Sequence, residues 1–77
     1  MVLNTVESRM VHAVGYEPRT QELEVITVSG RIVRYAGVPA HIYSEFMASH
    51  SKGRYLCSHI DNHYPAYELS QRQQLLR

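Results

Sequence analysis

The side chains with binding chemistry gather in two short segments, and they are mainly basic or aromatic. Arg31, Arg34 and Tyr35 stand within five residues, and residues 51–55 read Ser-Lys-Gly-Arg-Tyr. Arginine forks match the oxygens of a phosphate group, and tyrosine faces stack on nucleobases. These residue types predict a binding site for RNA or another phosphate-bearing, nucleotide-like ligand. The candidate residues are Arg31, Arg34, Tyr35, Ser51, Lys52, Gly53, Arg54 and Tyr55.

The Ser51-Lys52-Gly53 segment is the best candidate for anion binding. Backbone amides that open a helix can cradle a phosphate, and Ser51 is a suitable residue to precede a helix. A purely structural interpretation stands beside this one. Tyr35 and Tyr55 are each favoured as core residues, because aromatic side chains dominate small cores, and the charged side chains can be ordinary solvated ones.

Metal binding and nucleophilic catalysis are weaker interpretations of the remaining residues. His59 and His63 have the i,i+4 spacing that lets two imidazoles share a zinc ion, with Cys57 nearby. No second paired cluster completes the four ligands that zinc requires. Cys57 as a nucleophile needs a histidine base oriented by a third group, and a single cysteine among several histidines does not establish one. We therefore expect a protein that is not an enzyme and uses no metal or cofactor.

Length and composition favour one small domain. The chain has 77 residues, a net charge of +1 and a single cysteine, Cys57. The charge does not favour bulk polyanion binding, so a local patch must bind any nucleic acid. The first residues lack the features of a signal peptide, and no apolar run approaches the ~20 residues of a membrane span. We expect a cytoplasmic protein without a membrane segment, and a homo-oligomer, because association would supplement a small core.

The hydrophobic pattern predicts an α+β fold, a three-stranded antiparallel meander followed by two helices packed on one sheet face. Apolar, β-branched runs closed by turn residues indicate the strands, and apolar residues at helical spacing after Val38-Pro39 indicate the first helix. Pro65 ends the second helix region. The expected strands are 8–16, 22–28 and 31–35, the helices 39–49 and 51–63, the domain 8–64 and the C-terminal tail 65–77, a short helix or disordered.

The link at Ser29-Gly30 decides which strand residues share a face. A two-residue loop pairs Ile26 with Val33, whereas a three-residue loop ending at Arg31 places Leu23, Val25, Val33 and Tyr35 on one face. A slip of one residue exchanges the two faces completely. We favour the three-residue loop, because it turns four large residues inward together. The opposite face then carries Glu24, Ile26, Val28, Ile32 and Arg34.

The order and spacing of short motifs resemble the KTSC domain, a bacterial and phage module named after the C-terminal region of some lysyl-tRNA synthetases. No single motif is strong, but the series covers most of the chain. The matching residues are Ser8-Arg9-Met10-Val11, Val14-Gly15-Tyr16, Leu23-Glu24-Val25, Gly30, Val33-Arg34-Tyr35, Gly37-Val38-Pro39, Tyr43-Ser44-Glu45-Phe46, Ser51-Lys52-Gly53-Arg54-Tyr55, Ile60 and Tyr64.

The resemblance implies a small α+β domain and favours RNA binding as its function. Val33 replaces the first tyrosine of the family's Tyr-x-Tyr segment, and Cys57 replaces an asparagine. This chain therefore lacks two side chains of the family pattern. The alternative function is protein–protein interaction, as a phage-encoded inhibitor or a homo-oligomeric adaptor. It would use the apolar residues Ile26, Val28 and Ile32 together with Leu69 and Leu76 of the tail.

Overall fold

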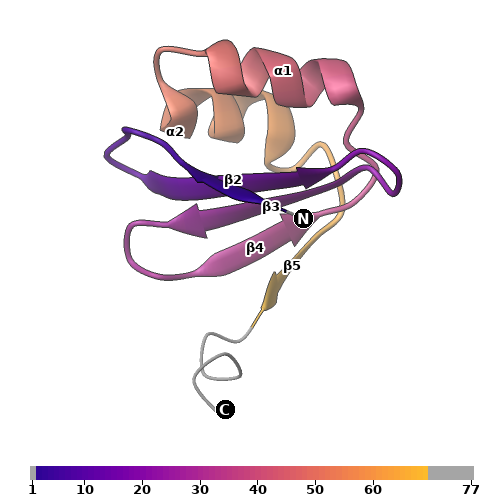
Figure 1. Cartoon of the computed structure of the whole chain (residues 1–77), viewed down its shortest axis with the longest axis horizontal. Coiled ribbons are helices and arrows are strands. Elements are labelled where there is room, and N and C mark those ends of the chain that lie inside the picture. The colour runs from indigo at the N-terminus through magenta and orange to yellow at the C-terminus, as the bar shows by residue number, and fades with distance from the viewer. Residues whose placement is uncertain (1, 70–77) are drawn as a thin grey trace.

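The computed structural model of the chain describes residues 2–69. Five strands form one antiparallel sheet in which neighbours in sequence are neighbours in space, and the helical segments lie on one side of it (Figure 1). The α+β class and the meander agree with expectation, but the sheet has five strands instead of three. The strands are β1 (Leu3–Thr5), β2 (Val11–Glu17), β3 (Glu22–Thr27), β4 (Ile32–Tyr35) and β5 (Ala66–Leu69).

The two additional strands are the edges of the sheet. β1 precedes the first expected strand, and β5 lies in the segment expected as a short helix or a disordered tail. β1 pairs with β2 through Leu3 and Gly15, and β5 pairs with β4 through Leu69 and Ile32. The remaining tail residues, including Leu76, lie outside the described part of the chain.

In the β3–β4 hairpin, the residues that share a face are those expected for a three-residue loop. Leu23 pairs with Tyr35, and Val25 pairs with Val33. The turn runs through residues 28–30, so it is centred one residue earlier than expected, and it closes with a hydrogen bond from the Thr27 amide to the Arg31 carbonyl. Gly30 has φ of 95°, in the left-handed region that glycine adopts without steric cost.

The helical part contains α1 (Ala40–Ala48), α2 (Lys52–Tyr55) and η1 (Leu56–Ile60), a π-helical continuation of α2. Pro39 precedes α1, as its fixed φ and missing amide hydrogen favour. The second helical region ends at Ile60, not at His63 as expected, and Asn62 follows with φ of 69°. Within residues 2–69, no helix is long and apolar enough to cross a membrane.

The core lies between the helices and the face of the sheet that carries Leu23, Val25 and Tyr35. Phe46 of α1 and Ile60 of η1 are fully buried against it. Tyr16 of β2 ties this face to the helical layer, because its ring stacks on Tyr43 at 4.5 Å and its hydroxyl donates to the Val38 carbonyl at 2.6 Å. The helix layer leaves part of β3, β4 and β5 uncovered, and a cleft forms there.

Candidate functional site

The predicted site residues are divided between two neighbouring hollows and the rest of the surface. Residues 51–54 line a hollow of about 410 Å³ between the α1–α2 link and the β1–β2 link, here called the corner hollow. Arg31 and Tyr35 line a cleft of about 700 Å³ between the sheet and η1, here called the sheet cleft. Both spaces are also lined by Arg9 and Met10. Arg34 and Tyr55 line neither of them.

The floor of the corner hollow is shaped by hydrogen bonds around Ser49. The Ser49 hydroxyl accepts from the Ser51 amide at 3.1 Å and donates to the Ser51 carbonyl at 3.0 Å. The Lys52 ammonium donates to the Ser49 carbonyl at 2.5 Å. Ser51 stands at the expected position before α2, but its side chain makes no capping hydrogen bond. The Ser51 amide is therefore already occupied, whereas the Lys52 ammonium retains two donor hydrogens.

The other wall is the tight link between β1 and β2. The Ser8 hydroxyl accepts from the Met10 amide at 3.1 Å and from the Val11 amide at 3.2 Å, which turns the chain and leaves Arg9 exposed. Gly53 allows this link to approach α2 closely, because a Cβ atom there would lie 3.2 Å from the Met10 Cβ atom. Gly53 therefore has a packing role in the corner hollow.

The corner hollow is positively charged. Arg9, Lys52 and Arg54 line it, and Glu7 is its only acidic residue. Across the described chain, the ion pairs found are those of Arg31 and Arg34, so none neutralises these three cations. His50 also lines the hollow. Guanidinium and ammonium groups converging on one concave surface suit a phosphate or a similar anion.

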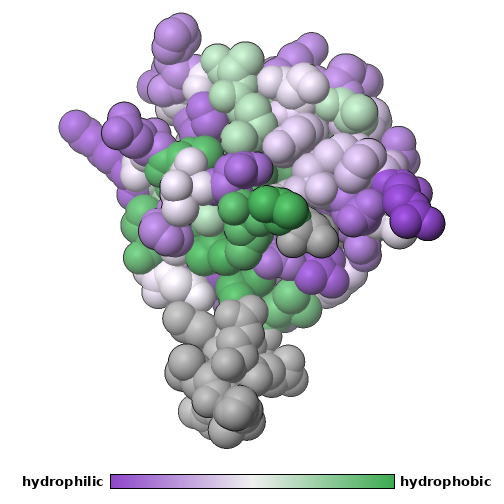
Figure 2. Space-filling view, viewed as in Figure 1, coloured by the Kyte–Doolittle hydropathy of each residue, from purple (hydrophilic) through white to green (hydrophobic). Residues whose placement is uncertain are grey.

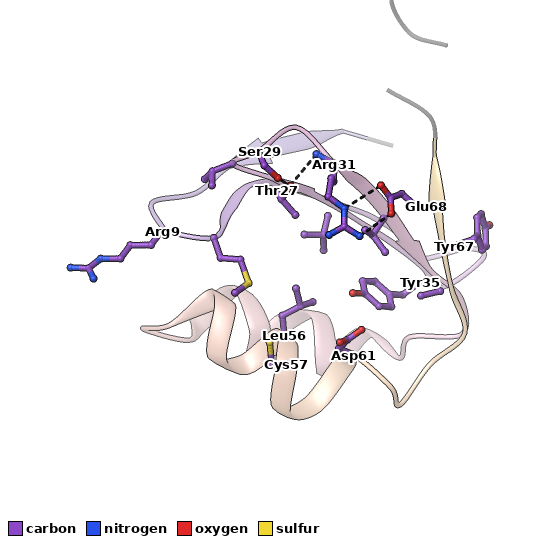
Figure 3. Close-up of a pocket in the computed structure, with 15 residues that line it drawn as sticks. Arg9, Thr27, Ser29, Arg31, Tyr35, Leu56, Cys57, Asp61, Tyr67 and Glu68 are labelled. Atoms are coloured by element: carbon purple, nitrogen blue, oxygen red, sulfur yellow. Dashed lines mark hydrogen bonds and ion pairs between the residues drawn. The ribbon is translucent and has the colours of Figure 1, made fainter. Parts of the chain in front are cut away.

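The sheet cleft has an apolar floor and a polar rim. Val25, Val33 and Leu56 contribute the floor. Figure 3 shows Arg31 and Glu68 on the sheet side of the open space, and Cys57 and Asp61 on the helix side. Its volume falls in the range of pockets that bind small molecules, which are mostly apolar with a few placed polar groups.

Arg31 is paired across the cleft rim with Glu68 of β5. Its Nε and Nη2 atoms donate to the two carboxylate oxygens at 3.1 and 2.8 Å, a bidentate arrangement. This pairing raises the pKa of the Arg31 guanidinium and lowers the pKa of the Glu68 carboxyl, mainly through the hydrogen bonds themselves. Both side chains are at least half exposed, so a ligand can compete for either of them.

Tyr35 is a core residue with its polar end at the cleft. The residue is only 4% exposed, as the structural interpretation of the sequence favoured. Burial raises the pKa of the Tyr35 hydroxyl to about 12, with a further contribution from the Asp61 carboxylate. The hydroxyl is consequently a proton donor throughout the physiological pH range.

Arg34 lies on the sheet face opposite to the helices, so it is separated from both hollows. Its Nε and Nη2 atoms donate to one carboxylate oxygen of Glu24 at 3.2 and 2.5 Å. The Glu24 side chain is about 10% exposed and the Arg34 side chain 30%. These hydrogen bonds raise the pKa of the Arg34 guanidinium. Arg34 therefore has a structural partner and does not join Arg31 and Tyr35 in one patch.

Tyr55 belongs to the packing between the helical segments. Its hydroxyl donates to Glu45 at 2.8 Å, and its ring stacks on Phe46 and on His59. Burial and the Glu45 carboxylate raise the pKa of Tyr55 to about 12. Of the eight predicted residues, Arg31 and Tyr35 share the cleft and residues 51–54 share the corner hollow.

Sequence reasoning missed the residues that complete both hollows. Arg9 and Met10 were not candidates, because they lie within the expected strand 8–16 and no spacing pattern connects them to residues 51–54. Asp61 and Glu68 reach the cleft only because η1 ends at Ile60 and β5 adds to β4. The one available signal was the isolated basic residue Arg9 beside the turn-forming Ser8.

The metal interpretation loses its geometric basis. The helical spacing of His59 and His63 is not realised, because the helix ends at Ile60, and His59 stacks on Tyr55 with ring centroids 4.3 Å apart. Within residues 2–69, no three His, Cys, Asp or Glu side chains lie close enough together to hold a metal ion.

Comparison with known proteins assigns the family. The family model described as "KTSC domain" matches residues 7–64. The chain belongs to the KTSC domain family. A crystal structure of a KTSC domain protein from Yersinia pestis superimposes with a TM-score of 0.84 and 27% sequence identity, covering 90% of this chain and 97% of the other. These comparisons give no support to the link with lysyl-tRNA synthetases.

One curated relative is also similar. It comes from Tsukamurella paurometabola, is named only "Protein", and is 32% identical over 54 residues, which are 70% of this chain and 81% of the relative. The name carries no function. In this KTSC domain, Val33 and Cys57, the two departures from the expected family pattern, both line the sheet cleft.

Proposed function

We propose that the chain is a non-enzymatic binding module for RNA or another phosphate-bearing ligand, with a phosphate group held in the corner hollow. The observation that carries this proposal is the convergence of Arg9, Lys52 and Arg54 on one concave surface that has a single acidic residue. The Lys52 ammonium is fixed by the Ser49 carbonyl, so part of the entropic cost of ordering its side chain is already met on folding.

The proposal assigns different roles to the residues that the sequence singled out. Lys52 and Arg54 contact phosphate, together with Arg9. Gly53 allows the close approach of Met10, and Ser51 contributes to the shape of the corner. Arg34 and Tyr55 support the fold through Glu24 and Glu45.

Equilibrium binding of a fluorescent single-stranded RNA oligonucleotide tests this function. Arg9→Gln and Arg54→Gln each remove one exposed cation from the corner hollow, and we expect each to weaken binding several-fold. Arg19→Gln is the matched control, because Arg19 is exposed in the β2–β3 turn at the opposite end of the sheet (Figure 1). Equal affinities for Arg54→Gln and Arg19→Gln would contradict the proposal.

Self-association is a second candidate function, supported by the exposed edge of the sheet. Val2 is 76% exposed and Leu3 is 44% exposed beside edge strand β1. The deepest hydrophobic colour in Figure 2 lies over the strands, and hydrophilic side chains dominate the margins. Unpaired edges favour pairing with a second copy. Of the residues expected to form the association surface, Ile32 is only 2% exposed, whereas Val28 is 58% exposed and lines the sheet cleft.

Sedimentation equilibrium over a wide concentration range tests the second candidate. We expect the apparent mass to rise with concentration, and Leu3→Lys to weaken the association by placing a charge at the edge. A strictly monomeric protein at the highest concentration would exclude self-association through this edge.

A further inference from the structure

The sheet cleft and the corner hollow are neighbours that share two residues. Arg9 and Met10 line both spaces, so they form the ridge between them. The ridge is held on both sides, since the Met10 carbonyl accepts from the Val28 amide at 2.9 Å and the Met10 side chain faces Gly53. A ligand with an anionic group in the corner hollow therefore has a second space immediately beside it.

The chemistry of the sheet cleft differs from that of the corner hollow. Its charged groups balance, because Arg9 and Arg31 are matched by Asp61 and Glu68. The cleft therefore has no electrostatic preference for an anion. Its apolar floor includes Val25, which is 1% exposed, and this floor suits an uncharged group with a flat apolar face.

We propose that the sheet cleft receives the base of a nucleotide whose phosphate occupies the corner hollow. This inference rests on the proposed function of the corner hollow and specifies the ligand class for the adjoining space. The same chemistry is offered by a free nucleotide and by an unpaired base in a single strand. Both sources place a flat, uncharged ring one sugar away from a phosphate group.

The cleft provides the two kinds of contact that a base requires. Apolar side chains at Met10 and Leu56 line the cleft, and proteins that bind an unstacked base can hold its ring between aromatic or apolar side chains. The polar edge of a base needs donors and acceptors together. Arg31 supplies donors, Asp61 and Glu68 supply acceptors, and the Tyr35 hydroxyl supplies a donor that stays protonated because its pKa is about 12.

Cys57 provides a direct measurement of occupancy, because its thiol is exposed, lines the cleft and is the only thiol in the chain. We would measure the rate of Cys57 alkylation with inorganic phosphate, ribose 5-phosphate, each nucleoside 5′-monophosphate, or a short single-stranded oligonucleotide. We expect nucleotides or the oligonucleotide to slow alkylation at least fivefold, and phosphate and ribose 5-phosphate to have no effect. Equal rates with all probes at saturation would overturn the proposal.

A cleft-filling variant gives an independent test. Cys57→Phe places a ring at the mouth of the cleft, and Ser58→Phe adds the same ring at the next, exposed position that lines neither hollow. We expect Cys57→Phe to reduce nucleotide affinity about fivefold or more, to the level of ribose 5-phosphate. Ser58→Phe should leave it unchanged. If both variants bind nucleotides as the parent chain does, the base does not enter the cleft.

The outcomes separate this inference from the function on which it rests. If no phosphate-bearing probe binds, or if Arg54→Gln binds all probes as the parent does, the corner proposal fails. If probes bind through Arg54 but the base adds no affinity and no protection of Cys57, the cleft proposal alone fails. If nucleotides bind and the oligonucleotide does not, the source is a free nucleotide. The reverse result identifies a single strand as the source.

Discussion

Arg31 and Arg34 stand three residues apart in sequence but on opposite faces of the sheet. The hairpin grouping predicted from the sequence already separates Arg34 from Tyr35, because alternate strand residues point to opposite faces. It did not reveal that each arginine has a carboxylate partner. Glu24 lies opposite Arg34 on β3, whereas Glu68 comes from a strand that the sequence did not predict. The Arg31 side chain is 62% exposed and the Arg34 side chain 30%, so Arg31 is the more accessible of the two to a ligand.

The two ion pairs should differ strongly in their effect on stability. Arg34→Met leaves the nearly buried Glu24 carboxylate without a partner, and we expect the free energy of unfolding to fall by about 2 kcal/mol or more. Arg31→Met should change it little, because that pair is solvated. Urea denaturation measures both variants. Equal losses in the two variants would contradict the distinction between them.

The Tyr35 hydroxyl gives the fold a pH dependence on the alkaline side. Its pKa is about 12 in the fold against an ordinary value near 10, so the unfolded chain releases its proton first. This contribution is fully present below pH 10 and is lost as the pH rises from about 10 to 12. We expect the free energy of unfolding to decline over that interval, by roughly 1–3 kcal/mol from Tyr35.

Tyr35→Phe isolates the contribution of this hydroxyl. The variant should show a shallower decline of the free energy of unfolding above pH 10 than the parent chain. Tyr67→Phe, which removes the hydroxyl of an exposed ring on β5, serves as the control. If the free energy of unfolding declines equally above pH 10 in the parent chain and in Tyr35→Phe, the Tyr35 hydroxyl has the same pKa in the folded and the unfolded chain.

At the scale of elements, the strands and helices with strong local patterns were predictable. β2, β3, β4 and α1 have apolar periodicity over at least four residues and are bounded by turn residues. β5 lacks such a signal, because Ala66, Tyr67 and Glu68 are all exposed and the strand depends on pairing with β4. The end of η1 at Ile60 was also not predictable, because the sequence keeps its helical spacing up to His63. The chain instead turns at Asn62, which has a positive φ.

The register of β5 leads to a prediction about proline. The Ala36 amide donates to the Pro65 carbonyl, so the alternation of an antiparallel ladder makes Arg34 and Tyr67 the next hydrogen-bonded pair. Tyr67→Pro removes an amide that donates a hydrogen bond to β4. The Glu68 amide points away from β4, so Glu68→Pro removes no hydrogen bond of the sheet. We expect Tyr67→Pro to be less stable than Tyr67→Ala by about 1–3 kcal/mol.

Thermal or urea unfolding of three variants tests this register. Glu68→Pro should be distinctly more stable than Tyr67→Pro, since proline is tolerated at outward positions of an edge strand. The opposite order of stability would mean that β5 pairs with β4 one residue out of the register described here.

At the scale of the whole molecule, the charge distribution matters more than the total. The net charge is only +1, but the corner hollow has three cations that form no ion pair within residues 2–69, and the charged residues of the sheet cleft balance. The sequence predicted half of the corner, residues 51–54, because those residues are contiguous. Arg9 joins them only through the packing of Met10 against Gly53, which brings two distant links of the chain together. Association through this corner should therefore depend on ionic strength although the whole chain is nearly neutral.

The most direct test of the proposal that the corner hollow binds phosphate is the salt dependence of affinity for a single-stranded RNA oligonucleotide. We expect log K to fall linearly with log salt concentration, because bound phosphates release counterions. Arg54→Gln should reduce the magnitude of the slope by about 0.7, the value for one phosphate contact to a single strand, and Arg19→Gln should leave it unchanged. An affinity independent of salt, or an equal slope for Arg54→Gln and the parent chain, would contradict phosphate binding at the corner.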